Sequence, residues 1–494
     1  MWLLVLLGLF ARLWRFGQVP VSLYWDEVAI GLDAQAILQT GKDLSGHPWL
    51  QALFYSYGDY KAPVYIWLTT LLGKLFSVSE LTIRLPSLLA SLAIAYLLFK
   101  LLKLLSPKKS KLPLYTLISF MIMPWAIHFA RIGFESHLSV FWLVLSIYLL
   151  IKATKAKSSL NIILASFSIS LGIYTYISLR VLAPIFFIIT FFIFHRSKLK
   201  QSLPAFLTSL AIIALSLVIL IRSPGYQSSQ QYRLSNDNLV TSTSHIDASV
   251  TGLQGQESSL LARIYHHRYI YKAKDYLSNY FQYFNPQFLA LSGDPNLRHH
   301  SGFGGQLLAF QALLLLTGVY ALIKQKPRQI LLLLTWLALS PAIAALVNET
   351  PHASRSIYLI IPLAWLCGLG WQFLAKNKKI NLIIVIALTL NLLLFSHDYF
   401  SHYPQRSAPA WLNPYKQVAL YIKNNSTTKS IYVTSEFYQP SLYFSFYANQ
   451  EIKSLPSSCP PESLCIASPD WQPDTTQKIS DIPNTDKLVI KQAL

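Results

Sequence analysis

Two adjacent carboxylates, Asp26 and Glu27, follow the first hydrophobic segment of the chain. Only 13% of the residues are charged, so an acidic pair between an apolar run and an amphipathic one is a candidate for function. A carboxylate at such a place can take the proton from a hydroxyl group as a general base. The alternative is that Asp26 is the N-cap of the following helix, where its side chain would accept backbone N–H bonds.

Four basic side chains further along the chain are candidates for holding a phosphate group, because cationic groups form strong hydrogen bonds with phosphate oxygens. They are Lys61, Arg131, His300 and Arg355. Two of them have structural alternatives at the membrane surface. Lys61 could anchor a helix at the lipid head groups, and Arg355 could be an ordinary interfacial arginine.

Glu135 is the acidic residue that follows Arg131 four positions later. At that spacing the two side chains could form a simple ion pair on one helix face. The competing interpretation makes Glu135 a second carboxylate of the functional site. The pair His299-His300 is a weaker signal. We expect no metal there, because the sequence offers neither a nearby cysteine nor a clear ligand spacing.

The composition indicates a polytopic membrane protein. Of 494 residues, 53% are hydrophobic and 14% are aromatic, which is more apolar surface than a soluble core could bury. The net charge of +20 could suggest binding to nucleic acid. The lysines, however, lie between apolar segments of membrane-spanning length, which is the positive-inside pattern. We therefore expect no nucleic-acid partner.

Apolar runs near the ~20 residues needed to cross a bilayer occur eleven times. They lie at residues 2–16, 84–105, 112–130, 138–153, 159–178, 181–195, 203–221, 306–323, 329–347, 357–375 and 380–396. One set of connections carries 17 lysines and arginines, whereas the alternate short connections carry three. This partition predicts a cytoplasmic N-terminus and an external C-terminus. The positive connections are 100–111, 152–157, 196–200, 324–328 and 376–379.

The first and longest loops are then predicted to lie outside the cytoplasm. The first, 17–83, should contain an amphipathic helix at 26–40 that Gly41 closes. The apolar segment 63–76 is short for a span and should be an interfacial helix. The long loop 222–305 includes an aromatic and basic stretch of the kind that lies on a membrane surface.

Residues 397–494 are soluble in character and predict a small external α/β appendage, with a helix near 415–423. The expected domains are therefore a transmembrane catalytic part, 1–396, and this C-terminal part. Cys459 and Cys465 could form a disulfide if the C-terminal part lies outside the cytoplasm.

On this topology the candidate residues all lie at the external face. They are Asp26, Glu27, Lys61, Arg131, Glu135, His137, His299, His300, His352 and Arg355. No nucleotide is available outside the cytoplasm, so a lipid-linked sugar donor fits this placement. Transfer from such a donor needs cations for the phosphate leaving group and a carboxylate for the proton of the acceptor hydroxyl.

Three motifs, taken in order, resemble the start of a known family. After the acidic pair comes Lys61-Ala62-Pro63-Val64-Tyr65, and then Arg84-Leu85-Pro86-Ser87. This order is similar to that of the C-type (GT-C) membrane glycosyltransferases, above all the protein O-mannosyltransferases and the bacterial aminoarabinose and lipopolysaccharide-core transferases. Ala62 stands where the family pattern has proline. The resemblance covers residues 1 to about 375 and implies an all-α membrane fold with about 11 transmembrane helices.

The resemblance implies an inverting transferase in a bacterial or archaeal plasma membrane. It would move a hexose or a pentose from an undecaprenyl- or dolichyl-type phosphate to an extracytoplasmic protein, lipid or glycan. The resemblance makes Asp26 the catalytic carboxylate with Glu27 as its neighbour, and it gives Glu135 the place of another acidic residue. Lys61 and the loop that contains Arg355 would lie by the donor phosphate.

Two questions stay open at this point. Asp26 and Glu135 could hold a magnesium or manganese ion through hard oxygen ligands, as in oligosaccharyltransferases, but other relatives work without a metal. The competing functions are oligosaccharide transfer by the same fold and transport of a lipid or glycan. A transporter would need ionisable residues along mid-membrane faces, whereas these spans are nearly free of acids.

Overall fold

The chain divides into two compact units, and each is described by itself. The computed structural model describes residues 1–156, 158–235, 239, 242–254, 259–325, 329–347, 349–425, 429–436, 439–471, 476–481 and 488–493. The helical unit comprises Met1–Trp14, Leu50–Tyr65 and Ser87–Asp398. The mixed unit comprises Arg15–Trp49, Ile66–Pro86 and Tyr399–Leu494. The C-terminal part of the chain thus shares a compact unit with two segments of the N-terminal region.

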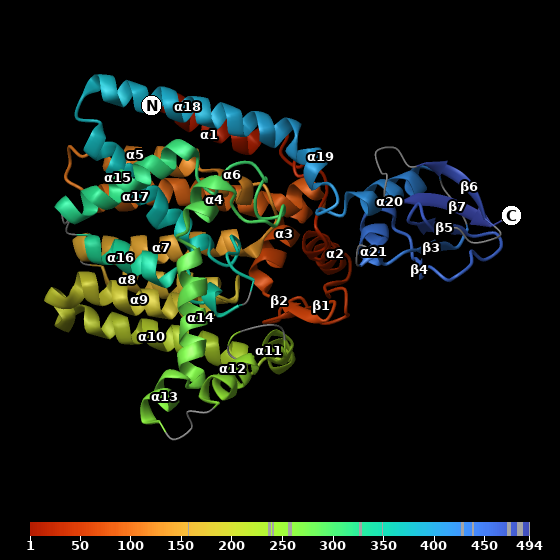
Figure 1. Ribbon diagram of the computed structural model, residues 1–494, viewed down its shortest axis with the longest axis horizontal. Helices are drawn as coiled ribbons and strands as arrows, with labels where there is room; N and C mark the ends of the chain where they lie inside the picture. The colour runs from red at the N-terminus through yellow and green to blue at the C-terminus, as the bar shows by residue number, and fades with distance from the viewer. Residues whose placement is uncertain are drawn as a thin grey trace. The chain divides into compact units, whose positions relative to one another are not determined.

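Each of the eleven predicted spans coincides with helix in the structure. The helices are α1 (Trp2–Leu13), α4 (Glu80–Leu105), α5 (Leu112–Met121), α6 (Pro124–Phe129), α7 (Glu135–Ala156), α8 (Ser159–Ile173), α9 (Leu179–His195), α10 (Leu199–Ile221), α15 (Ala309–Gln325), α16 (Ile330–Leu339), α17 (Ile360–Leu374) and α18 (Lys378–Ser401). In Figure 1 the helices α5, α15 and α17 lie side by side, and so do α7 and α8.

Five helical segments of the described chain are long and apolar enough to cross a membrane, and six shorter ones are apolar. Helix α18 buries one set of large apolar side chains and exposes another. The exposed ones include Leu382, Ile383, Ile386, Leu390, Leu393 and Leu394. A contiguous apolar surface of this kind would be unfavourable in water and is stable against lipid. The prediction of an all-α polytopic membrane protein is confirmed.

The predicted span 112–130 is broken into α5 and α6 at Pro124, which has no N–H to continue the helix. The carbonyl groups at the end of α5 therefore need other donors. Arg12 supplies them, because its guanidinium is fully buried and donates to the carbonyl oxygens of Met121 and Phe120. A buried cation in an apolar unit thus serves the backbone at a helix break.

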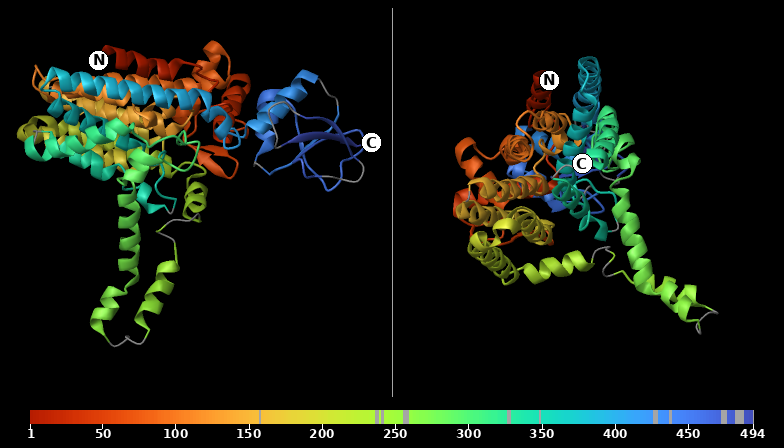
Figure 2. Two further views of the ribbon diagram at one scale, coloured as in Figure 1. Left: turned by 45° about the horizontal axis from the view of Figure 1, so that its top comes forward. Right: turned by 90° about the vertical axis from the view of Figure 1, so that its left-hand side faces the viewer.

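The loop 222–305 is largely helical, as α11 (Tyr226–Ser235), α12 (Ser244–Leu253), α13 (Leu260–Tyr265) and α14 (Arg268–Gln282). Both views of Figure 2 show α13 and α14 extending away from the long helices of their unit. Helix α14 carries exposed apolar side chains, among them Tyr269 and Phe281, beside Lys272 and Lys274. This pattern supports the prediction of a segment that lies on a membrane surface.

The mixed unit is built around one core. Helix α2 (Trp25–Thr40) ends at Gly41, whose φ of 71° is left-handed, as predicted. The expectation that this helix is amphipathic is wrong, because every residue from Glu27 to Ala34 is buried. Its apolar side chains pack with the start of α4 and with the C-terminal segment in a shared core that includes Val28, Ile83 and Tyr443.

The C-terminal segment has the predicted α/β character. Its helices are α19 (Tyr403–Ser407), α20 (Asn413–Asn425) and α21 (Pro440–Tyr443). Its strands are β3 (Ile431–Val433), β4 (Lys453–Ser454), β5 (Leu464–Ala467), β6 (Thr476–Asp481) and β7 (Val489–Ala493), and they form one sheet in the order β4-β3-β5-β7-β6. β3 is parallel to β4 and β5, whereas β7 is antiparallel to β5 and β6.

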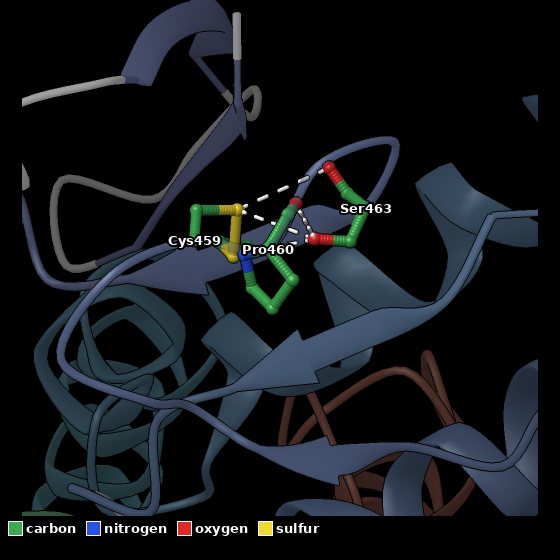
Figure 3. Close-up of a disulfide and its surroundings, with 4 residues drawn as sticks. Cys459, Pro460 and Ser463 are labelled. Carbon is green, nitrogen blue, oxygen red and sulfur yellow. Dashed lines mark hydrogen bonds between the residues drawn. A yellow bond between two sulfur atoms is a disulfide. The ribbon is translucent and has the colours of Figure 1, made fainter.

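Cys459 and Cys465 form a disulfide, which Figure 3 shows. The bond closes a short loop in which the hydroxyl of Ser463 donates to the carbonyl oxygen of Pro460. Cys465 lies in β5, so the disulfide fastens the preceding loop to the sheet. Disulfides persist in oxidising compartments, and this pairing agrees with an extracytoplasmic C-terminal segment.

Candidate functional site

The structure places Asp26 in the first turn of α2, which begins at Trp25. The N-cap residue is Tyr24, so the alternative that Asp26 is the N-cap is wrong. Instead, Glu27 reaches back and accepts a hydrogen bond from the backbone N–H of Tyr24 at 2.9 Å. Asp26 is half-buried and does not serve as the cap, which leaves its predicted role as a base compatible with the local geometry.

Glu27 is fully buried and forms an ion pair with Arg84, whose Nε lies 3.1 Å from Oε1 of Glu27. The same guanidinium donates to the carbonyl oxygens of Pro20, at 2.8 Å, and Ser22. It also lies over the ring of Trp411, 5.7 Å from the centroid. Arg84 therefore joins the start of α4 to the segment before α2, and it gives Glu27 a positioning role. Its sequence motif was recognised, but no role was predicted for it.

Three segments of the helical unit that lie far apart in the sequence contact one another. We call them the α6–α7 connection (residues 130–134), the glycine loop (293–305) and the arginine loop (349–356). The first contains Arg131 and leads into Glu135, the second contains His300, and the third contains Arg355. Asn348, the first residue of the predicted motif before α17, lies outside the described residues.

The glycine loop packs against α6 and the α6–α7 connection. The Nε2 atom of His128 lies 2.9 Å from the carbonyl oxygen of Arg298. The ring of His299 stacks on Phe129 at a centroid distance of 6.4 Å and meets the edge of Phe134 at 6.0 Å. Aromatic packing therefore holds the glycine loop against the segment that leads to Glu135.

The arginine loop is tied to the start of α7. The hydroxyls of Ser136 and Ser354 lie 2.8 Å apart, and those of Ser139 and Tyr358 lie 2.8 Å apart. Ser136 follows Glu135 directly, and Ser354 precedes Arg355. The structure thus brings the stretches that carry these two predicted site residues together, although more than two hundred positions separate the bonded serines.

The two terminal nitrogens of the Arg355 guanidinium differ in their hydrogen bonding. Its Nη2 donates to Glu349 at 3.3 Å, in a pair whose glutamate is largely exposed. Its Nη1 is buried and has no hydrogen-bond partner among the described residues. A buried donor without a partner is unfavourable, and an anionic oxygen is the strongest acceptor that could satisfy it. Nearby, burial raises the pKa of Tyr283, and the charge of Arg355 opposes that rise.

Asp294, His299 and His352 form a cluster between the glycine loop and the arginine loop. The Oδ2 atom of Asp294 lies 3.3 Å from Nδ1 of His299, and the rings of the two histidines are 4.3 Å apart. Backbone N–H groups of Asn296 and Ala353 donate to the Asp294 carboxylate at 2.8 and 2.7 Å. The sequence did not predict this cluster, because its members come from two loops.

The local charges act in opposite directions on the members of this cluster. Burial by itself raises the pKa of Asp294, but the contact with His299 and the two backbone donors lower it by more, so the pKa of Asp294 lies below its ordinary value. Burial, followed by the charges of His299 and Arg355, lowers the pKa of His352 well below its ordinary value. A carboxylate and a neutral imidazole are therefore favoured side by side.

Two of the predicted phosphate-binding residues make structural bonds. His300 accepts a hydrogen bond from the N–H of Gly302 at 3.0 Å, and its Nε2 lies 3.2 Å from the carbonyl oxygen of Gly305. To contact a phosphate oxygen through a ring nitrogen, as predicted, His300 would have to give up one of these two hydrogen bonds. Arg131 is fully buried and donates to the carbonyl oxygens of Ala11 and Arg12, both at 2.9 Å, at the end of α1.

Lys61 ends a short hairpin in the helical unit, formed by β1 (Phe54–Ser56) and β2 (Asp59–Lys61), and it is half-buried. The turn uses left-handed backbone at Tyr57 and Gly58, which suits a two-residue hairpin loop. The hairpin leads into α3 (Pro63–Phe76), where the N–H of Val64 donates to the carbonyl oxygen of Tyr174. The contact of Lys61 with a donor phosphate stays a prediction.

Comparison with known proteins matches residues 60–221 to the family described as dolichyl-phosphate-mannose-protein mannosyltransferase. Among solved structures, ArnT from Cupriavidus metallidurans bound to undecaprenyl phosphate is similar, with a TM-score of 0.56 and 11% identity over 99% of this chain and 97% of that chain. No curated protein matches the sequence.

The oligosaccharyltransferase of Archaeoglobus fulgidus is also similar. In its form tethered to an acceptor peptide the TM-score is 0.54 with 14% identity, and in its complex with an inhibitory peptide and a dolichol-phosphate the TM-score is 0.51 with 12% identity. Each match covers 92% of this chain and 64% of the archaeal chain, so this chain spans less than two thirds of that enzyme. Together the matches confirm the predicted resemblance to the GT-C membrane glycosyltransferases and the predicted fold.

Proposed function

We propose that this membrane protein with the GT-C fold transfers one sugar, a hexose or a pentose, from a polyprenyl-phosphate donor to an acceptor hydroxyl, with inversion at the anomeric carbon. The observation that carries the proposal is Arg355. Its buried Nη1 has no partner among the described residues, beside the start of α7 where Glu135 lies. A donor phosphate would complete that site, because a guanidinium binds phosphate oxygens with strong, directed hydrogen bonds.

In the proposed reaction the acceptor oxygen attacks the anomeric carbon while the bond to the phosphate oxygen breaks. Arg355, with Lys61 as the second cation, stabilises the negative charge that the phosphate gains on leaving. Asp26 accepts the proton of the acceptor hydroxyl. Glu27 holds the start of α2 through Arg84, and Glu135 is the second carboxylate to test.

The similar proteins support the chemistry of the donor. ArnT was solved with undecaprenyl phosphate and the archaeal oligosaccharyltransferase with a dolichol-phosphate, and both ligands are polyprenyl-type phosphates. An oligosaccharide transfer is the second candidate, because the archaeal enzyme has this fold and carries an acceptor peptide in one structure. The same proteins support a membrane-embedded lipid donor more than a soluble nucleotide sugar.

The test is transfer by purified protein in lipid nanodiscs, with a panel of radiolabelled monosaccharides and one oligosaccharide on polyprenyl carriers. We expect transfer from at least one monosaccharide phosphate and a donor KM about tenfold higher for Arg355→Lys, because losing one directed, charge-assisted hydrogen bond costs about 1.5 kcal/mol or more. Transfer of the oligosaccharide alone would favour the second candidate. An inert protein across a panel that labels a control transferase would refute the proposal.

The same assay tests the metal prediction. A magnesium or manganese ion held by Asp26 and Glu135 would make transfer sensitive to EDTA, and either ion should then restore it. Full activity after chelation would show that the reaction needs no exchangeable metal.

The proposed site requires its loops to face away from the cytoplasm, which the charge partition of the connections supports. An enzyme reporter that works only in the cytoplasm should be active when fused after Lys109 and silent when fused at the C-terminus. A fluorescent reporter at the same two positions controls for expression. The reverse pattern would place the proposed site on the cytoplasmic side and remove the argument for a lipid-linked donor.

A further inference from the structure

We infer that Asp294, His299 and His352 form a binding site for a zinc-class divalent cation that cross-links the glycine loop and the arginine loop. The three side chains can each offer one ligand atom, and these atoms all lie within 4.8 Å of one another. This site is separate from the predicted cation site of Asp26 and Glu135, with which it shares no residue.

The donor set is suited to zinc. Two imidazole nitrogens and one carboxylate oxygen are ligands that zinc prefers, whereas magnesium and calcium prefer oxygen alone. Around a tetrahedral zinc ion, with bonds of about 2.0–2.2 Å, ligand atoms lie roughly 3.4 Å apart. The Asp294–His299 contact of 3.3 Å already has this spacing, and His352 offers its ligand atom within 4.8 Å of the other two.

The surroundings hold the ligands in place. Asp294 is 3% exposed and His299 is 6% exposed, so neither side chain is free to turn into solvent. Backbone N–H groups of Asn296 and Ala353 fix the carboxylate, and Phe129 and Phe134 pack against the His299 ring. Such outer contacts orient the ligands of protein metal sites. The backbone N–H of Arg355 donates to Nδ1 of His352 at 3.3 Å, which ties this ring to the arginine loop.

Charge near the cluster is compatible with a bound cation. Asp294 contributes one negative charge, and the nearest cation on the arginine loop, Arg355, is paired with Glu349 at 3.3 Å. His352 lies three residues before Arg355, so an ion at this cluster would fix the backbone that presents that arginine. The expected role is therefore to position the arginine loop, and it does not depend on a sugar donor being present.

The test uses tag-free, full-length protein in nanodiscs, loaded with excess zinc, desalted and analysed by mass spectrometry for metal. We expect about one zinc ion per chain in the wild type and in His267→Ala, a matched variant in the same long loop. His299→Ala and His352→Ala should each lose most of it. Magnesium treated in the same way should not be retained.

Thermal unfolding of the wild type gives a second readout that needs no variant. Zinc that binds the folded state should raise the unfolding midpoint above that of the EDTA-treated protein, and this rise should vanish in His299→Ala. The inference is overturned if the wild type retains far less than one zinc ion, or if both cluster variants retain as much as His267→Ala. Because neither measurement involves turnover, its result is independent of the proposed transferase activity.

Discussion

Replacing Asp26 with asparagine should slow turnover at least ~100-fold, the usual scale for loss of a general base. Asparagine has nearly the same size but carries no charge and cannot take a proton from the acceptor hydroxyl. The fold should tolerate the change, because Asp26 is not the N-cap of α2, and a charge in the first helical turn contributes only about 0.3–1 kcal/mol. Initial rates at saturating donor measure the effect.

Glu135→Gln is the matched control, since it removes the other carboxylate that the sequence indicates. We expect it to leave more activity than Asp26→Asn. Donor binding, measured by filtration with radiolabelled polyprenyl-phosphate sugar, should be unchanged in Asp26→Asn, because the base acts on the acceptor. Wild-type turnover in Asp26→Asn would remove this residue from the mechanism, and a greater loss in Glu135→Gln would transfer the role there.

Replacing Glu27 with alanine should destabilise the protein by about 3–5 kcal/mol, as expected when one partner of a buried ion pair is removed. Arg84 would keep its contacts with the carbonyl oxygens of Pro20 and Ser22 but would lose its counter-charge inside a fully buried site. The backbone N–H of Tyr24 would lose its acceptor as well. The melting midpoint and the rate of limited proteolysis in detergent measure the effect.

The double variant Glu27→Ala with Arg84→Met separates loss of the pair from loss of packing. Methionine fills much of the space of arginine without its charge, so the double variant should be more stable than Glu27→Ala alone. If Glu27→Ala melts at the wild-type temperature, Glu27 is not a positioning residue. A double variant that is less stable than the single one would show that Arg84 stabilises the unit without Glu27.

The membrane fold was predictable from short stretches of sequence. A segment in lipid must satisfy its own backbone hydrogen bonds and present apolar side chains. About twenty consecutive residues are therefore enough to identify each spanning helix. The break at Pro124 and the end of α2 at Gly41 also follow from the local sequence, because proline lacks an N–H and glycine adopts the left-handed backbone conformation. The order of three short motifs was enough to indicate the GT-C fold.

The contacts of the candidate site depend on tertiary structure, because their partners are distant in the chain. Fifty-seven positions separate Glu27 from Arg84, so the acidic pair alone could not show that Glu27 is committed to an ion pair. The burial of the α2 residues from Glu27 to Ala34 follows from packing with the start of α4 and with the C-terminal segment, which the pattern of residues within the helix does not reveal. Asp294 and His352 meet because two loops pack together, so their spacing along the chain does not indicate that they share a site.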